Sequence, residues 1–208
     1  MNLVRELDLS HLKAGFAEPV RDAQRCFRAV LDAMARPGRI VELGDLRDLP
    51  ESPAGLGAAQ SAVLLALADI DTPVWLPPAL RDAEAGHYLR FHCGCRLATR
   101  LADAVFVVPP SLAELPALDE LRLGEPEFPD RSATLIVEVD DLAAGGPLHL
   151  TGPGIESEAR LAVAGWRAAA TDFLRENRRR FPLGVDLLLT CGNRVVGLPR
   201  TVRIASEA

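Results

Sequence analysis

The 208-residue sequence predicts an α/β fold with a covered, mixed central sheet. Short strand-like segments alternate with helical ones along the chain, which is typical of this fold class. The clearest segment is 181–201, where two apolar runs, 185–189 and 195–198, flank Cys191-Gly192-Asn193-Arg194. Because glycine and asparagine tolerate positive φ, we expect a hairpin of two strands here. The first run is apolar on both faces, which predicts a strand inside a sheet that is covered on both sides.

A single α/β domain is expected over residues 18–208, after a loosely ordered leader over residues 1–17 that shows little periodicity. The clearest helix starts at Val20 and ends at Arg36-Pro37-Gly38, because proline cannot continue a helix and glycine favours its left-handed exit. The residues expected to face the core are Ala23, Phe27, Val30, Leu31 and Met34, at a spacing of three to four. Further helices are predicted over 58–68, 80–91 and 166–180, strands over 39–43, 74–76, 104–108, 134–139 and, after a Gly145-Gly146 turn, 147–150, with turns and one weak helix over 111–132.

The composition excludes several classes of protein. A net charge of −6 argues against a broad nucleic-acid surface, and 5% aromatic residues are too few for a base-stacking platform. The longest apolar stretch, 62–68, is far shorter than the roughly 20 residues that cross a bilayer. The N-terminal residues include acids where a signal peptide would be apolar, so we expect a cytoplasmic protein with reduced cysteines.

Lysine is almost absent from the chain. Lys and Arg together number 23, and Lys13 is the only lysine. No core lysine therefore exists to form a Schiff base or to act as a nucleophile of lowered pKa. Arginine remains available to bind phosphate-like anions or carboxylates in a fork geometry.

The segment His92-Cys93-Gly94-Cys95 carries an imidazole and two thiols that could ligate zinc. Structural zinc sites usually have two to four residues between their paired cysteines, whereas only Gly94 separates Cys93 from Cys95. Such sites also need a fourth ligand, which the sequence does not clearly supply. A helix end with buried thiols and a hydrogen-bonded histidine is the favoured interpretation, and we predict no metal site.

Asp69 and Asp71 stand two residues apart where a predicted helix ends. Paired carboxylates can bind a divalent cation or share acid and base roles. Such residues more often close a turn through the backbone, here helped by Pro73, and the turn is favoured.

The loop Thr151-Gly152-Pro153-Gly154 follows a predicted strand and could approach a phosphate with its amides. It matches no dinucleotide or phosphate-loop pattern, because Ser157 stands where a third glycine is needed and no Gly-Lys-Ser/Thr is present. A structural turn is favoured.

Arg200 follows the predicted hairpin and could direct its guanidinium into a cleft, although an arginine in a salt bridge is at least as good an interpretation. No Ser/His/Asp arrangement can be assigned, so catalytic residues stay unknown. The candidate substrate-binding residues are Asp69, Asp71, Arg90, His92, Thr151, Gly152, Gly154 and Arg200.

Several segments, taken in their order, are similar to one known family. They are residues 16–19, Phe27, Met34 and Arg36-Pro37-Gly38, then 67–76, 89–92, 133–136, 150–155 and 181–201. They extend from about residue 16 to the C-terminus, with the least similarity over 111–132. On these segments the chain resembles the PhnH family of bacterial phosphonate metabolism proteins, subunits of the carbon–phosphorus lyase system.

The resemblance implies a subunit that acts with PhnG, PhnI and PhnL in making ribose 1-methylphosphonate 5-triphosphate from ATP and methylphosphonate. It also implies a core complex with PhnG, PhnI and PhnJ, and a homodimer. The implied fold is a three-layer sandwich similar to pyridoxal-phosphate-dependent transferases, without the cofactor. The position of Lys13 is consistent with a missing cofactor. A pyridoxal-phosphate enzyme needs a lysine in the sheet to form the aldimine, and Lys13 lies in the predicted leader.

Three hypotheses follow for function. The favoured one is a non-catalytic or co-catalytic subunit of that complex, with no cofactor, no membrane partner and no nucleic-acid partner. The second is a stand-alone transferase that binds a nucleotide or phosphonate through Arg90, Arg200 and the loop 151–154. The third is a metal or redox module at Cys93 and Cys95.

Overall fold

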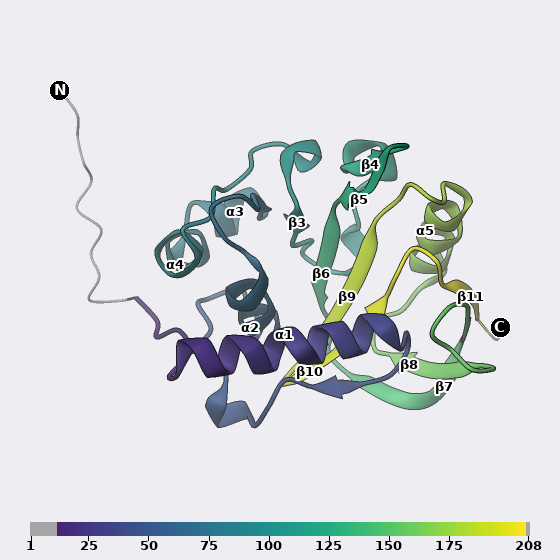
Figure 1. Cartoon of the computed structure of the whole chain (residues 1–208), viewed down its shortest axis with the longest axis horizontal. Helices are drawn as coiled ribbons and strands as arrows, with labels where there is room; N and C mark the ends of the chain where they lie inside the picture. Colours follow the sequence, from purple (N-terminus) through teal and green to yellow (C-terminus); the bar gives the residue numbers. More distant parts are fainter. Residues whose placement is uncertain (1–11, 207–208) are drawn as a thin grey trace.

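The computed structural model describes residues 12–206 (Figure 1). The helices are α1 (Pro19–Ala35), α2 (Ala58–Leu67), α3 (Pro78–Arg81), α4 (Glu84–Cys93) and α5 (Ala168–Arg179), with short 3-10 helices at Leu46–Asp48, Leu101–Asp103, Leu112–Glu114 and Leu118–Glu120. The strands are β1 (Val41–Glu42), β2 (Val74–Trp75), β3 (Phe106–Val107), β4 (Leu123–Glu125), β5 (Phe128–Ser132), β6 (Thr134–Glu138), β7 (Leu142–Thr151), β8 (Ala159–Val163), β9 (Asp186–Cys191), β10 (Arg194–Leu198) and β11 (Arg203–Ser206). Within the described residues, no helix is both long enough and apolar enough to cross a membrane.

The central sheet has six strands in the order β1-β10-β9-β6-β3-β2. Strands β1, β10 and β9 are antiparallel neighbours, whereas β9, β6, β3 and β2 run parallel, so the sheet is mixed. The predicted hairpin is confirmed as β9 and β10, with Val195 opposite Thr190 and Leu198 opposite Leu187. Its turn contains Gly192 at φ 59°, a backbone conformation that favours glycine.

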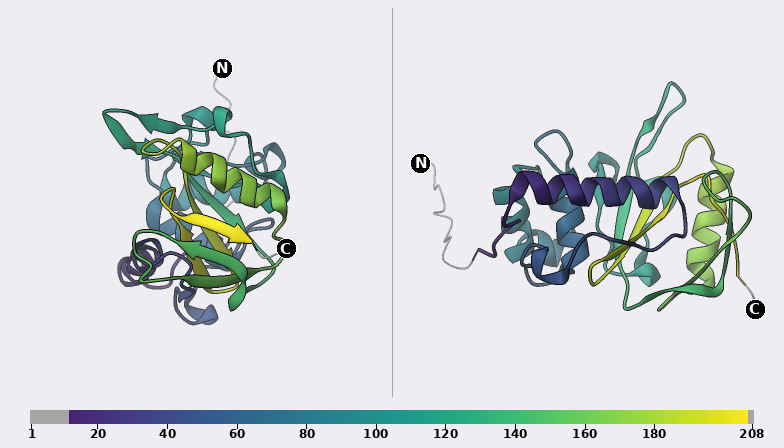
Figure 2. Two further views of the ribbon diagram at one scale, coloured as in Figure 1. Left: turned by 90° about the vertical axis from the view of Figure 1, so that its right-hand side faces the viewer. Right: turned by 60° about the horizontal axis from the view of Figure 1, so that its bottom comes forward.

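Both faces of the central sheet are covered (Figures 1 and 2). Helices α1, α2 and α4 pack on one face, and the antiparallel sheet β11-β7-β8 lies with α5 on the other. Ile136 and Leu188 point into the helical core, while their chain neighbours Leu135 and Leu187 point into the second core. Burial of each such side chain contributes about 1.5–3 kcal/mol, so β6 and β9 hold the two cores together.

Helix α1 presents a different face to the core than the sequence predicts. Phe27 and Leu31, both expected inside, are 45% and 53% exposed. Gly197 of β10 explains this orientation, because a Cβ atom there would lie 2.6 Å from the Ala33 carbonyl oxygen. Such a close approach requires small side chains on the helix. The buried apolar face consists of Cys26, Ala29, Val30 and Ala33.

The predicted helix over residues 80–91 is in fact two helices, α3 and α4. Gly86 packs against the turn between them, and a Cβ atom there would lie 1.8 Å from the Arg81 carbonyl oxygen. Glycine thus allows a compact break that periodicity does not reveal. Tyr88 of α4 is buried, whereas Phe91 is 54% exposed.

The predicted turn at Gly145-Gly146 is wrong, because β7 continues through these residues. Gly146 lies against β8, where a Cβ atom would be 2.3 Å from the Ala162 nitrogen. The register shifts between Ala144 and Leu148, so residues 145–147, which include the two glycines, form a bulge within the strand.

Strands β4 and β5 form a hairpin arm that projects from the body (Figure 2). The arm lies within the segment 111–132, where the sequence predicts only turns and a weak helix. Pro126, Pro129 and several charged residues interrupt the alternation of apolar and polar residues there, so the strand pattern is hidden. The sequence likewise predicts neither β8 nor β11.

The described part of the predicted leader, residues 12–17, has no regular secondary structure. Phe16 nevertheless packs against the helical core. The Ala14 carbonyl accepts a hydrogen bond of 3.0 Å from the Glu51 amide. Residues 12–17 are therefore held against the body, whereas residues 1–11 lie outside the described residues.

Candidate functional site

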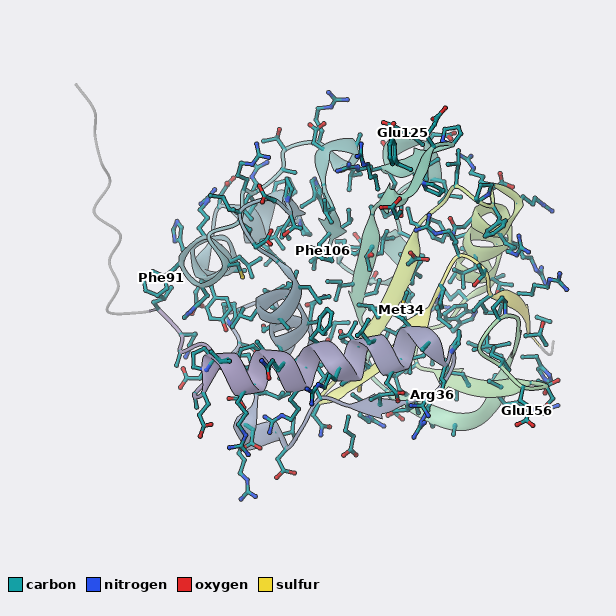
Figure 3. The ribbon with its side chains drawn as sticks, viewed as in Figure 1. Met34, Arg36, Phe91, Phe106, Glu125 and Glu156 are labelled. Atoms are coloured by element: carbon teal, nitrogen blue, oxygen red, sulfur yellow. The ribbon has the colours of Figure 1, made fainter. Side chains whose placement is uncertain are left out.

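The candidate substrate-binding residues predicted from the sequence do not surround one cavity. They lie after α2 (Asp69, Asp71), on α4 (Arg90, His92), at the end of β7 and in the loop that follows it (Thr151, Gly152, Gly154), and after β10 (Arg200). Phe91, next to His92, and Glu156, close to Gly154, mark opposite ends of the molecule in Figure 3. Each group has its own local role.

Asp69 closes the turn after α2, as the favoured interpretation holds. Its Oδ1 accepts hydrogen bonds from the Thr72 hydroxyl at 2.8 Å and from the Asp71 amide at 3.0 Å. Both aspartates are exposed. The Asp69 carboxylate is thus used within its own turn.

The side chains of His92 and of the two nearby cysteines form hydrogen bonds with backbone carbonyl groups. His92 Nε2 lies 3.0 Å from the Lys13 carbonyl oxygen. The Cys93 and Cys95 thiols each donate to a carbonyl at 3.8 Å, those of Leu64 and Leu89. The hydrogen bond with Cys95 and burial raise the pKa of Cys93, so this thiol stays protonated. Across residues 12–206, no three His, Cys, Asp or Glu side chains are grouped so that they could hold a metal ion.

The loop over residues 151–154 packs against the C-terminal end of α1. Its turn is closed by a hydrogen bond of 3.1 Å from the Ile155 amide to the Gly152 carbonyl. Gly154, at φ 83°, approaches so closely that a Cβ atom would lie 2.2 Å from the Ala35 carbonyl oxygen. These glycines serve the contact between the loop and the helix.

Arg200 is bound within the protein. Its side chain is 11% exposed and pairs with Asp186 at 2.6 Å. It also donates to the Pro129 carbonyl at 2.8 Å and to the Ser132 hydroxyl. The guanidinium therefore ties the start of β9 to the base of the β4–β5 arm.

A different part of the chain forms a cavity of about 510 Å³ at the carboxyl edge of the parallel strands β3 and β6. Its wall combines the residues before α2, those after β3 and β6, and those before α5. Its lining consists of residues 55–57, 110–113, 138–140, 164–165 and Arg167. In sheets with parallel strands, this edge is where ligands bind. We call it the edge cavity.

Glu138, the last residue of β6, is the half-buried carboxylate of the edge cavity. It accepts hydrogen bonds from the Thr190 hydroxyl and from the Gly192 amide. Gly57, before α2, lies directly against the carboxyl group. Burial raises the pKa of Glu138 above its ordinary value, and the two hydrogen bonds oppose that shift.

The start of α2 is fixed against the same strands. The Gln60 side chain donates to the Ile136 carbonyl at 3.0 Å, and the Ala59 amide donates to the Gly192 carbonyl at 2.9 Å. The β9–β10 turn thus holds both α2 and Glu138, so the position of the carboxylate depends on the hairpin.

Sequence reasoning did not single out Glu138, Gly57 or Arg167. One signal could have found the first, since an acidic residue ends a strongly β-branched strand, the place where parallel sheets present ligand-binding groups. No comparable signal marks Gly57 or Arg167, because each meets the cavity only through tertiary packing.

The mixed sheet and the cavity at its edge define an α/β protein with a half-buried carboxylate at the carboxyl ends of its parallel strands. Residues 14–205 match the family described as bacterial phosphonate metabolism protein (PhnH), and the chain belongs to this family. The resemblance inferred from separate sequence segments is thereby confirmed.

Two relatives support the same assignment. The chain is 42% identical over 192 residues to the α-D-ribose 1-methylphosphonate 5-triphosphate synthase subunit PhnH of Rhizobium meliloti (strain 1021), covering 92% of this chain and 94% of the relative. It is 36% identical over 184 residues to HtxG of Stutzerimonas stutzeri, provisionally named a C-P lyase subunit protein, covering 87% and 85% of the two chains.

Proposed function

We propose that this chain is a subunit of a carbon–phosphorus lyase system for the breakdown of organic phosphonates. With its partner subunits it is needed to form ribose 1-methylphosphonate 5-triphosphate from ATP and methylphosphonate, in the cytoplasm, where ATP is available. The observation that carries this proposal is the 42% identity to the Rhizobium meliloti subunit over nearly the full length of both chains. Similarity over this much of both chains cannot come from a single shared motif.

The partners we propose are PhnG, PhnI and PhnL for the synthase reaction, PhnG, PhnI and PhnJ in a core complex, and a second copy of the chain in a homodimer. The outer surface of α1 supports a role as a subunit. Val20, Phe27 and Leu31 are 75%, 45% and 53% exposed, and their spacing places them on one stripe of the helix. Large apolar side chains gathered on an exposed surface favour contact with another protein. We call these three residues the α1 stripe.

We further propose a relationship in fold to pyridoxal-phosphate-dependent transferases, supported by the mixed sheet that is covered on both faces. The residues present do not fit that cofactor. Lys13, the only lysine, is exposed and precedes α1, and its carbonyl oxygen is bonded to His92. We therefore propose a subunit that works without pyridoxal phosphate and has no independent turnover.

Reconstitution tests the proposed function. The partner subunits are purified with and without this chain and incubated with ATP and methylphosphonate, and the ribose product is followed by phosphorus NMR. We expect product only when this chain is present together with its partners, and none from the chain alone. Equal product without this chain would refute the proposal, and turnover by the chain alone would favour a stand-alone transferase.

A further inference from the structure

The Glu138 carboxylate is held in one position at the wall of the edge cavity. The Thr190 hydroxyl and the Gly192 amide each donate a hydrogen bond to it. Gly57 occupies the space beside it, where even a methyl group would collide with the carboxyl carbon. A carboxylate restrained in this way presents its remaining lone pairs in a fixed direction, which reduces the cost of ordering it when a ligand binds.

Arg167 provides the basic group of the same cavity. It is exposed, and within residues 12–206 it forms no ion pair. The preceding residue, Trp166, is fixed by a hydrogen bond of 2.9 Å from its indole nitrogen to the Thr171 hydroxyl. The guanidinium is therefore attached to a positioned segment while its donors stay available, and a planar guanidinium binds phosphate oxygens in pairs.

The size and the polar groups of the edge cavity together restrict its ligand. About 510 Å³ lies within the range of roughly 300–1,000 Å³ that small-molecule sites occupy. An ionised carboxylate only accepts hydrogen bonds, so Glu138 requires a hydroxyl or N–H donor from the ligand. Methylphosphonate alone offers a compact anion that Glu138 and Asp140 would repel. A molecule with hydroxyls at one end and an anionic group at the other can donate hydrogen bonds to Glu138 and accept them from Arg167.

We propose that the edge cavity binds a phosphorylated sugar or nucleotide, with sugar hydroxyls donating to Glu138 and phosphate oxygens accepting from Arg167. The inference deepens the proposed function and rests on it, since that reaction handles a ribose that carries phosphate groups. It assigns this subunit a substrate or product site of its own, made entirely from residues of this chain.

Calorimetric titration of the full chain, alone and in its reconstituted complex, tests the site. The probes are ATP, ribose 5-phosphate, inorganic phosphate and methylphosphonate. Glu138→Gln is expected to weaken ribose 5-phosphate binding about tenfold, because the hydrogen bonds to a charged acceptor are lost. It is not expected to weaken the binding of inorganic phosphate, since the charge that is removed repels that anion. Arg167→Ala is expected to weaken both by a similar factor.

Matched controls are Glu125→Gln on the β4–β5 arm (Figure 3) and Arg175→Ala on α5, both outside the cavity. Both should bind like the unaltered chain, and thermal melts of all variants should show that they are folded. If neither probe with a sugar binds in any form of the protein, or if both cavity variants bind as the controls do, the inference is overturned. If the reconstituted reaction nevertheless gave product only in the presence of this chain, the proposed function would still hold. Failure of the binding site and failure of the proposed function can therefore be distinguished.

Discussion

Gly57 lies against the carboxyl group of Glu138, at a distance that only glycine allows. A Cβ atom at residue 57 would be 2.3 Å from Glu138 Cδ and 2.4 Å from its Oε1. The backbone of Gly57, at φ −75° and ψ 163°, is ordinary extended chain that any residue adopts. The contact with the carboxylate, and not the conformation, therefore requires glycine here.

Gly57→Ala is expected to destabilise the fold by about 1–3 kcal/mol, because the added methyl group must displace the carboxylate or the start of α2. Urea unfolding of the variant measures this loss. In a Glu138→Ala background the same substitution should have little effect, since the space beside residue 57 is then free. Fully additive losses in the double variant would contradict the direct contact.

Glu138→Gln should change how stability depends on pH. Because burial raises the pKa of folded Glu138, the unfolded chain releases this proton more readily, and ionisation favours unfolding. The stability that the protonated group provides is complete below its ordinary pKa of 4.5 and is lost as the pH rises through the higher folded pKa. The free energy of unfolding of Glu138→Gln, measured relative to that of the unaltered chain, should therefore increase as the pH rises from 4 toward neutrality.

Chemical denaturation at a series of pH values measures that difference. Glu125→Gln, at an exposed position on the arm, is the control and should show no such trend. A difference between Glu138→Gln and the unaltered chain that stays flat or narrows with rising pH would argue against a carboxylate that burial disfavours.

Substitutions in the α1 stripe should weaken assembly and leave the fold intact. We expect the double variant Phe27→Glu, Leu31→Glu to lose co-purification with its partners or its own dimer, because charges replace exposed apolar contacts. Light scattering and pull-down with tagged partner subunits give the measurement. Ile70→Glu, at an apolar residue that is 68% exposed outside α1, is the matched control. If the double variant assembles as well as this control does, the stripe is not a contact surface.

The central sheet could be predicted from the sequence because its signal is local. The β9–β10 hairpin combines two largely apolar runs with a Gly-Asn turn, and its apolar side chains point to both faces of a covered sheet. The orientation of α1 could not be predicted. It depends on the approach of Ala33 to Gly197, two residues far apart in the sequence, and apolar periodicity alone favours the larger Phe27 and Leu31.

The candidate site was harder to predict, because its parts become neighbours only through the topology of the sheet. Strand β6 pairs in parallel with β9, and this brings Glu138 opposite Thr190 and beside the hairpin turn. Gly57 reaches the same carboxylate from before α2, and Arg167 approaches from before α5 on the opposite layer. The candidate residues with the clearest sequence pattern, such as Asp69 and the loop 151–154, lie in turns that local hydrogen bonds close.

Arg200→Ala should act through stability. The ion pair with Asp186 is largely buried, the two side chains being 11% and 20% exposed. Loss of the guanidinium leaves that carboxylate without its charge partner and frees the Pro129 carbonyl at the base of the arm. Removal of one member of a buried pair typically costs about 3–5 kcal/mol, and we expect a loss of that order in urea unfolding.

Two further variants separate this role from ligand binding. Arg200→Ala combined with Asp186→Asn should recover part of the lost stability, because no unpaired charge remains. Arg203→Ala, at an exposed arginine on β11, should change stability by less than about 0.5 kcal/mol. A substrate-binding Arg200 would give the reverse result, in which affinity for ATP or ribose 5-phosphate falls while the unfolding curve stays unchanged. Because the guanidinium already donates to Asp186, to the Ser132 hydroxyl and to the Pro129 carbonyl, we expect the loss to appear in the unfolding curve.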